Sequence, residues 1–182
     1  MKKNKIILGI DPGTNIMGYG LIEKNKSNIS FICLDVIILN KLPTHNLKLE
    51  KIFTKTIDLI KMFNPDEIAI EAPFFGKNVQ SMLKLGRAQG AAIIASTINK
   101  IPITEYAPKK IKMAITGKGQ ASKEQVAGML INMLKLKEMP KYLDSTDGLA
   151  VAVCHALQNK KISTQGKINW TQFVKSNPKR IN

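Results

Sequence analysis

The chain has 182 residues, of which 44% are hydrophobic and 23% charged, a composition typical of one globular domain rather than a disordered chain. Its 28 Lys and Arg residues outnumber 13 Asp and Glu residues, for a net charge of +15. This excess favours polyanionic partners, above all nucleic acid. The alternative is that the protein comes from an AT-rich genome, which enriches lysine in all proteins. No apolar run reaches the roughly 18 residues of a membrane span, and no segment has signal-peptide character.

The first predicted element is a short buried strand over residues 6–10, followed by a Pro-Gly turn. Asp11 ends this strand, where a lone carboxylate needs a cation such as a divalent metal or a lysine. The alternative is that Asp11 only starts an Asx-Pro turn. Gly13, Gly18 and Gly20 suggest a bare backbone that something bulky approaches, and their spacing matches no nucleotide-binding loop.

The following elements complete a mixed α/β pattern. Two strands separated by a polar turn form an antiparallel meander with the first, and later strands alternate with amphipathic helices. We expect these strands at 17–24, 29–39, 66–71 and 103–106, and helices at 47–63, 79–99, 108–116, 122–134 and 144–158. This order predicts an α/β fold with a mixed five-stranded sheet, three antiparallel strands and then parallel crossovers, flanked by helices.

Two segments and two thiols complete the predicted organisation. The helix over 79–99 is rich in glycine and alanine, which allow another helix to pack closely, within the chain or across a dimer. Residues 1–158 are predicted to form the folded domain, and 159–182 a partly ordered basic tail. Cys33 and Cys154 lie in apolar sequence without CxxC spacing, which indicates reduced core residues of a cytoplasmic protein.

Four carboxylates are predicted to converge. Ligands of open α/β sheets bind beyond the strand ends, so Asp11 meets Glu71, which ends the strand over 66–71, if the two strands are neighbours. Asp144 and Asp147 are three residues apart at the start of the last helix and share one face. Acids also suit a helix N-terminus, and the alternative is that one of this pair is an N-cap.

Such a cluster needs cations, because four unpaired carboxylates repel one another. Two divalent ions about 4 Å apart would relieve this repulsion and form a two-metal site for phosphoryl transfer. Ligand sets made only of oxygen favour Mg²⁺ or Mn²⁺ over zinc. His155 lies about 16 Å along the helix from Asp144 and is interpreted as structural. His45 is placed in a loop and carries no functional signal.

Basic and aromatic residues indicate a nucleic-acid surface. An exposed aromatic side chain stacks on an unpaired base for about 1–3 kcal/mol. Phe74 and Phe75 share a loop, and we expect one to be exposed and the other to lie in the core. Clustered lysines track a phosphate backbone, although a solvated surface is the alternative for the first two. These lysines are Lys109, Lys110, Lys112, Lys118 and Lys123.

With these residues in place, the sequence resembles the RuvC family of bacterial Holliday-junction resolvases, in the RNase H-like superfamily. The shared segments run in order from about residue 5 to 158: GIDPGTNIMGYG, AIEAPFFGKN, LKLGRAQGAA, EYAPKKIKMAITGKGQASKEQV and DSTDGLAVAVCHA. The resemblance implies a homodimeric endonuclease with two Mg²⁺ per subunit, for which Mn²⁺ substitutes. It would nick four-way DNA junctions symmetrically in recombination and repair, leave 5′-phosphate and 3′-hydroxyl ends, and cooperate with RuvA–RuvB in the cytoplasm.

The resemblance also assigns residues. The family's catalytic, metal-binding carboxylates match Asp11, Glu71, Asp144 and Asp147. Because Asp144 stands where some members have histidine, it is either a metal ligand or a base. The DNA-binding candidates are Phe74, which matches a base-stacking aromatic, Lys112 and Lys123, which match phosphate-binding residues, and Lys77, Asn78 and Lys118 in the same segments.

Three other protein classes share part of this pattern. Sugar kinases and actin-like ATPases open with a similar turn but need two such halves, more than 182 residues supply. The YqgF-type RNA-processing nuclease shares the fold but lacks the features of residues 74–78 and 112–123. A junction-binding protein without catalysis would keep the lysines but would not need four aligned acids.

Overall fold

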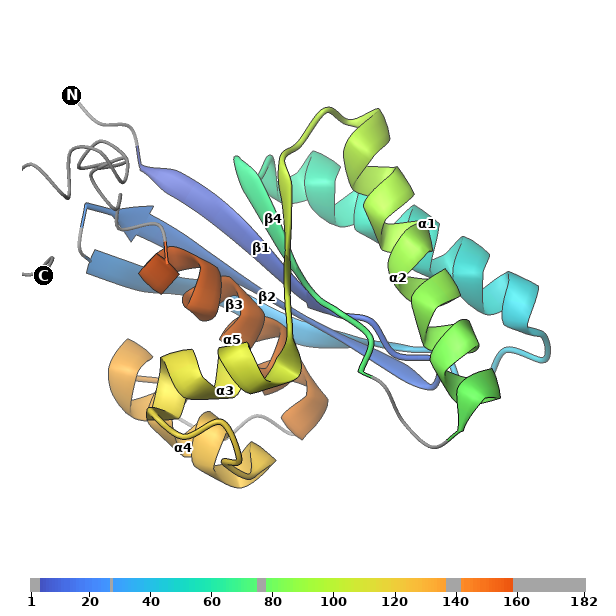
Figure 1. Ribbon diagram of the computed structural model, residues 1–182. Coiled ribbons are helices and arrows are strands. Elements are labelled where there is room, and N and C mark those ends of the chain that lie inside the picture. Colours follow the sequence, from blue (N-terminus) through green and yellow to red (C-terminus); the bar gives the residue numbers. More distant parts are fainter. Residues whose placement is uncertain (1–3, 27, 75–77, 137–141, 159–182) are drawn as a thin grey trace, which may run out of the picture.

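The computed structural model describes residues 4–26, 28–74, 78–136 and 142–158 (Figure 1). The strands are β1 Lys5–Asp11, β2 Ile16–Asn25, β3 Asn28–Ile38, β4 Glu67–Glu71 and β5 Ile103–Tyr106. The helices are α1 His45–Phe63, α2 Val79–Ile98, α3 Pro108–Thr116, α4 Lys123–Leu134 and α5 Leu143–Gln158. The predicted elements are therefore confirmed, with ends that shift by one or two residues.

The strands form one mixed sheet in the order β3-β2-β1-β4-β5. β1, β2 and β3 pair antiparallel, and β4 and β5 are parallel to β1. This confirms the predicted mixed topology. It also meets the condition for Asp11 and Glu71 to converge, because β1 and β4 are neighbours. The parallel pairs require crossovers, which α1 and α2 supply.

Helices cover both faces of this sheet, with α1 and α2 on one side and α3, α4 and α5 on the other (Figure 1). Side chains alternate between the faces along each strand. Leu8 and Ile10 of β1 belong to the cluster that includes Ile52 of α1, whereas Ile7 belongs to the cluster that includes Leu149 of α5. All five of these side chains are fully buried. The chain thus has two apolar layers separated by the sheet.

Local sequence explains the helix ends. Asn64 adopts a left-handed conformation, with φ 44°, and closes α1 before a proline. Ser122 and Gln125 form the predicted capping box at the start of α4. The placement of His45 in a loop is wrong, because Thr44 caps α1 and His45 is its first helical residue.

Two of the three glycines predicted to leave the backbone bare, Gly18 and Gly20, let α5 lie directly on the sheet, whereas a Cβ atom on Gly13 would meet the carbonyl group of Ile16 in the same turn. A Cβ atom on Gly18 would overlap the carbonyl oxygen of Asp144, and one on Gly20 would lie 2.5 Å from the Cα atom of Leu149. Real Cβ atoms do not approach other atoms this closely. The bulky neighbour of this bare backbone is therefore α5 itself, and the contact fixes the helix turn that carries Asp144.

We expect Gly18→Ala to lower the free energy of unfolding by about 1–3 kcal/mol or more, because the new methyl group displaces the first turn of α5. Thermal denaturation measures this loss. A matched control is Gly128→Ala inside α4, where nothing lies within 4 Å of an added Cβ atom. Alanine there is expected to stabilise the helix by up to about 1 kcal/mol. Equal melting temperatures for the two variants would contradict the close contact.

Three other predictions concern the chain at large. Cys154 is buried as predicted, but Cys33 is only half-buried on the edge strand β3. The predicted tail, residues 159–182, and its boundary with the domain lie outside the described residues. Among the helices that the structure describes, none is long and apolar enough to cross a membrane.

Candidate active site

The sheet register brings the two strand-end carboxylates together. Ile10 of β1 pairs with Ile70 of β4, so Asp11 and Glu71 follow at the carboxyl ends of adjacent parallel strands. Since side chains alternate along a strand, both acids point to the face opposite Ile10 and Ile70. That face is covered by α3, α4 and α5 (Figure 1).

The other two acids enter from α5. Asp144 and Asp147 lie on one face of the helix, and both bind the Lys123 ammonium at the start of α4. The distances from Lys123 Nζ are 3.0 Å to Asp144 Oδ1 and 2.5 Å to Asp147 Oδ2. The N-cap alternative is wrong for this pair, because α5 begins at Leu143 and both acids are helical residues.

Three of the four acids line one cavity of about 710 Å³ between the sheet end and α3, α4 and α5. Its acidic wall consists of Asp11, Glu71 and Asp147. Asp144 is not part of the lining and joins the site through Lys123. The other lining residues are Phe74, Pro108, Lys109, Ile111, Lys112, Gly119, Gln120, Lys123, Val126 and Ala150.

The carboxylates lie in an environment that disfavours their negative charge. Burial, and then the charge of Asp147, raises the pKa of Asp11 to about 7. Burial, and then the charge of Asp11, raises the pKa of Glu71 to about 8. Burial also raises the pKa of Asp147, against the opposing effect of Lys123. A further cation would therefore stabilise the ionised cluster.

Lys123 is the counter-ion of this cluster. Burial alone would lower its pKa, but the bonds to Asp147 and Asp144 outweigh burial and raise it. Within the described part of the chain, no three Asp, Glu, His or Cys side chains are placed to hold one metal ion together. The four acids nevertheless suit hard divalent cations, because a carboxylate offers only oxygen donors. When the acids are ionised, their negative charge is not fully balanced by the neighbouring lysine.

The predicted DNA-binding residues lie at several places. Phe74 lines the cavity with 71% of its surface exposed, whereas Phe75 and Lys77 lie outside the described residues. Lys112 lines the cavity, whereas Lys118 is exposed in the α3–α4 loop and is not one of the lining residues. Asn78 caps α2, because its Oδ1 accepts a hydrogen bond from the Ser81 N–H at 3.0 Å.

Two polar lining residues, Lys109 and Gln120, are not among the predicted DNA-binding candidates. Lys109 belongs to the predicted lysine cluster, with a solvated surface as the alternative, and it lines the cavity, where its stem would contact a Cβ atom on Gly119. The neighbouring Lys110 instead makes a cation–π contact, with its Nζ atom 5.0 Å from the centre of the Tyr106 ring. Gln120 carried no signal in the sequence, because an uncharged loop residue matches no motif.

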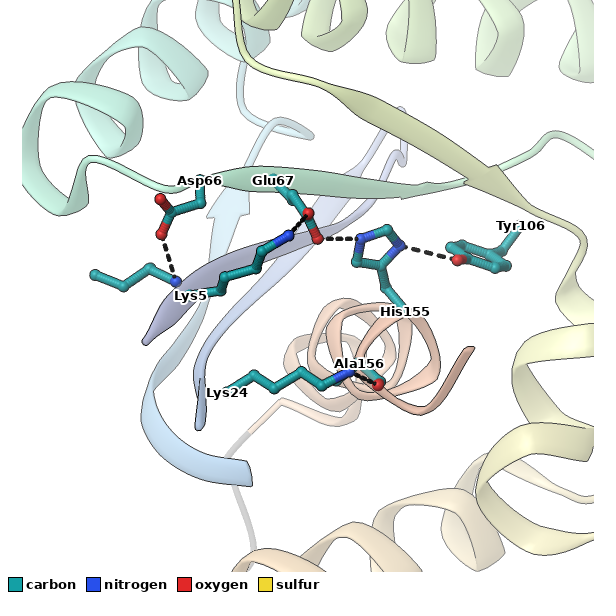
Figure 2. A network of polar contacts seen from close by, with 8 residues as sticks. Lys5, Lys24, Asp66, Glu67, Tyr106, His155 and Ala156 are labelled. Carbon is teal, nitrogen blue, oxygen red and sulfur yellow. Dashed lines mark hydrogen bonds and ion pairs between the residues drawn. The ribbon is translucent and has the colours of Figure 1, made fainter. Parts of the chain in front are cut away.

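His155 is structural, as predicted. Its Nδ1 lies 2.8 Å from the Tyr106 hydroxyl and its Nε2 lies 2.9 Å from Glu67 Oε2 (Figure 2). Lys5 pairs with the same glutamate, and Lys24 donates to the carbonyl oxygen of Ala156. Although burial opposes ionisation, the hydrogen bonds from Lys5 and His155 lower the pKa of Glu67. This network fastens the C-terminal end of α5 to the sheet.

Comparison with known sequences identifies a family. Residues 7–155 match the family described as "Crossover junction endodeoxyribonuclease RuvC". A relative of that name from Christiangramia forsetii is 58% identical over 182 residues, which are 100% of this chain and 95% of the relative. Another from Bacteroides fragilis is 56% identical and covers 98% of this chain and 97% of its own length.

Solved structures of Holliday junction resolvases have a similar fold. The structure of Thermus thermophilus RuvC in complex with a Holliday junction substrate is similar, with a TM-score of 0.77 and 30% identity over 85% of this chain and 94% of that one. The yeast mitochondrial Holliday junction resolvase Ydc2 is 16% identical, with a TM-score of 0.58 over 83% of this chain and 78% of its own. At that identity it shows the shared fold alone.

Proposed function

Because the chain belongs to the RuvC family of crossover junction endodeoxyribonucleases, we propose that it resolves four-way DNA junctions at the carboxylate cavity. Family membership confirms the resemblance drawn from the sequence and sets aside the ATPase and RNA-processing alternatives. One observation carries the assignment of the site: Asp11, Glu71 and Asp147, from three separate elements, line one cavity together with lysines. Acids and lysines around one cavity suit a phosphodiester substrate.

The proposed reaction is hydrolysis. Water attacks the scissile phosphorus and the P–O3′ bond breaks, which leaves 5′-phosphate and 3′-hydroxyl ends. Two Mg²⁺ ions, or Mn²⁺ in their place, would supply Lewis-acid chemistry when bound. Asp11 and Glu71, on fixed strand ends, would hold them with Asp147, and Asp144 would serve as a further ligand or as a base. Lys112 and Lys123 would contact the phosphate oxygens, which orients the strand for in-line attack.

A cleavage assay tests this function. A synthetic four-way junction, a DNA duplex and an RNA–DNA hybrid are each incubated with the protein, with and without Mg²⁺. We expect paired nicks in strands of like polarity, on the junction alone and with the metal alone. Binding without cleavage would favour the non-catalytic alternative, and cleavage of the hybrid alone would contradict junction resolution.

We expect Phe74→Ala to slow junction cleavage about tenfold or more while changing junction affinity less. An exposed aromatic contributes about 1–3 kcal/mol by stacking on a base, and the junction centre supplies unpaired bases. Single-turnover cleavage and equilibrium binding separate the two effects. Met62→Ala on α1, which removes another side chain that is 73% exposed, is the control. Unchanged turnover for Phe74→Ala would contradict the stacking role.

The proposed homodimer would use the outer face of α2. The inner face buries Ala88, Ala92 and Ala95, whereas nothing lies within 4 Å of a Cβ atom added to Gly86 or Gly90. Four large apolar side chains on the helix are 47–64% exposed: Val79, Leu83, Ile94 and Ile98. Such an apolar face suits a second copy of the chain. Sedimentation equilibrium measures the state, and a monomer at micromolar concentration would contradict the dimer.

Two further proposals rest on family membership. The RuvA–RuvB branch-migration complex is a proposed partner, because it would deliver the junction that this nuclease cuts. The proposed location is the cytoplasm, where bacterial chromosomal DNA lies.

A further inference from the structure

A buried amide on α2 reaches the backbone of a proposed metal ligand from behind the sheet. Only 7% of Gln89 is exposed. Its Nε2 lies 2.8 Å from Glu105 Oε2 of β5 and 3.4 Å from the carbonyl oxygen of Glu71. A side-chain amide has two N–H donors, so one can serve each acceptor. Gln89 therefore ties α2 to both β4 and β5.

Glu71 stands where the sheet gives β4 less support. The pairing of β1 with β4 ends at Ile70, one residue earlier, so Glu71 keeps only Tyr106 of β5 as a register partner. The strand itself ends at Glu71. The Ala72 N–H donates to the carbonyl oxygen of Tyr106 at 2.9 Å. The longer contact from Gln89 to the Glu71 carbonyl holds the other side of the same peptide group.

The side chain and the backbone carbonyl of Glu71 face different parts of the structure. Its side chain lines the cavity that faces α3, α4 and α5, whereas Gln89 belongs to α2 on the opposite face and is absent from that lining. Gln89 therefore cannot touch DNA or metal in the cavity. Any effect of Gln89 on the cavity must pass through the Glu71 backbone or through Glu105.

We propose that Gln89 is a positioning residue for junction cleavage, which holds the Glu71 backbone so that its carboxylate faces Asp11. This proposal rests on the proposed function. It also connects the helix with the proposed dimer face to the nuclease centre. Gln89 lies on the sheet-facing side of α2, opposite the proposed dimer face. Its contacts are therefore the same in the monomer and in the dimer.

The test removes the donors without changing the size of the side chain. Gln89→Glu keeps the shape but places a carboxylate against Glu105 and the Glu71 carbonyl, and Gln89→Met removes the donors without adding charge. For both variants we expect single-turnover cleavage to fall about 10- to 100-fold, as is usual for residues behind a metal ligand. Junction affinity should stay within about twofold, and calorimetry should show weaker Mg²⁺ or Mn²⁺ binding.

A double variant separates positioning from simple tethering. Gln89→Glu with Glu105→Gln reverses the donor and acceptor, which restores the bond between α2 and β5 but leaves the Glu71 carbonyl without its donor. We expect melting temperature to recover while cleavage and metal binding stay impaired. Glu105→Gln alone keeps the Gln89 donors and should behave like the parent protein.

Each outcome decides the proposal. Recovery of cleavage in the double variant, or parental cleavage by Gln89→Met, would show that Gln89 only joins α2 to β5. If Gln89→Glu does not fold, Gln89→Met and the double variant still give the answer. Failure of the parent protein to cleave junctions would instead count against the proposed function.

Discussion

Asp11→Asn is expected to lower the rate of junction cleavage by at least about 10²–10³-fold, with junction affinity unchanged within about twofold. Asparagine keeps the size of the side chain but removes a charge at the centre of the acidic wall, and loss of one preorganised electrostatic group typically costs this much. Lysines rather than acids supply the affinity for phosphates. Single-turnover cleavage of a synthetic junction with saturating Mg²⁺ measures the rate.

The control for this variant is Asp58→Asn on α1, where a carboxylate that is 56% exposed pairs with Lys55 on the surface. Its cleavage rate should match that of the parent. Substantial Mg²⁺-dependent cutting by Asp11→Asn would remove Asp11 from the active site.

The same variant should change stability in a pH-dependent way. The pKa of Asp11 rises from an ordinary 3.8 to about 7 in the folded protein. The folded state therefore keeps a proton that the unfolded chain loses, so stability declines as pH rises from about 4 to 7. Asn cannot ionise. Asp11→Asn should thus melt at a higher temperature than the parent at pH 8 with a chelator present, and the difference should shrink at pH 4.

Junction affinity is expected to fall by about 10³–10⁵ between 50 and 200 mM salt, the loss usual for about 6–10 phosphate contacts. The net charge of +15 supports this number of phosphate contacts. Lys109, Lys112 and Lys123 line the cavity, with Lys118 in the loop between α3 and α4. Two copies of these four lysines in a dimer reach that range.

Titration of a fluorescent junction at several salt concentrations gives the slope of log affinity against log salt. Lys112→Gln should reduce the slope by about one for each contact removed. Lys51→Gln, exposed on α1 on the far side of the sheet, should leave it unchanged. A flat response of the parent protein would refute the electrostatic basis of binding.

Sequence patterns predicted the strand-end acids because each follows a buried apolar run and precedes a turn. The periodicity also predicted the shared face of Asp144 and Asp147, which the common partner Lys123 confirms. It could not predict that α5 begins at Leu143, because helix ends vary by a residue or two. The N-cap alternative failed for that reason.

Other features depend on packing between elements far apart in the chain. The pairing of Lys123 with two acids requires α4 and α5 to lie side by side, which no local pattern encodes. The contacts of Gln89 with Glu71 and Glu105 could not be predicted either, because they depend on how α2 packs against β4 and β5. The roles of Lys77 and Asn78 in DNA binding stay predictions, as do the metal ligands themselves.

The direct contact between α5 and the bare backbone at Gly18 and Gly20 limits how this protein can evolve. In an ordinary core, a larger side chain at one position is compensated by a smaller one opposite. Here the nearest opposing atoms are main-chain atoms of Asp144 and Leu149, so a smaller side chain at either position would not make room for a Cβ atom. An alanine at Gly18 or Gly20 can therefore be accommodated only if the backbone of α5 moves away from the sheet.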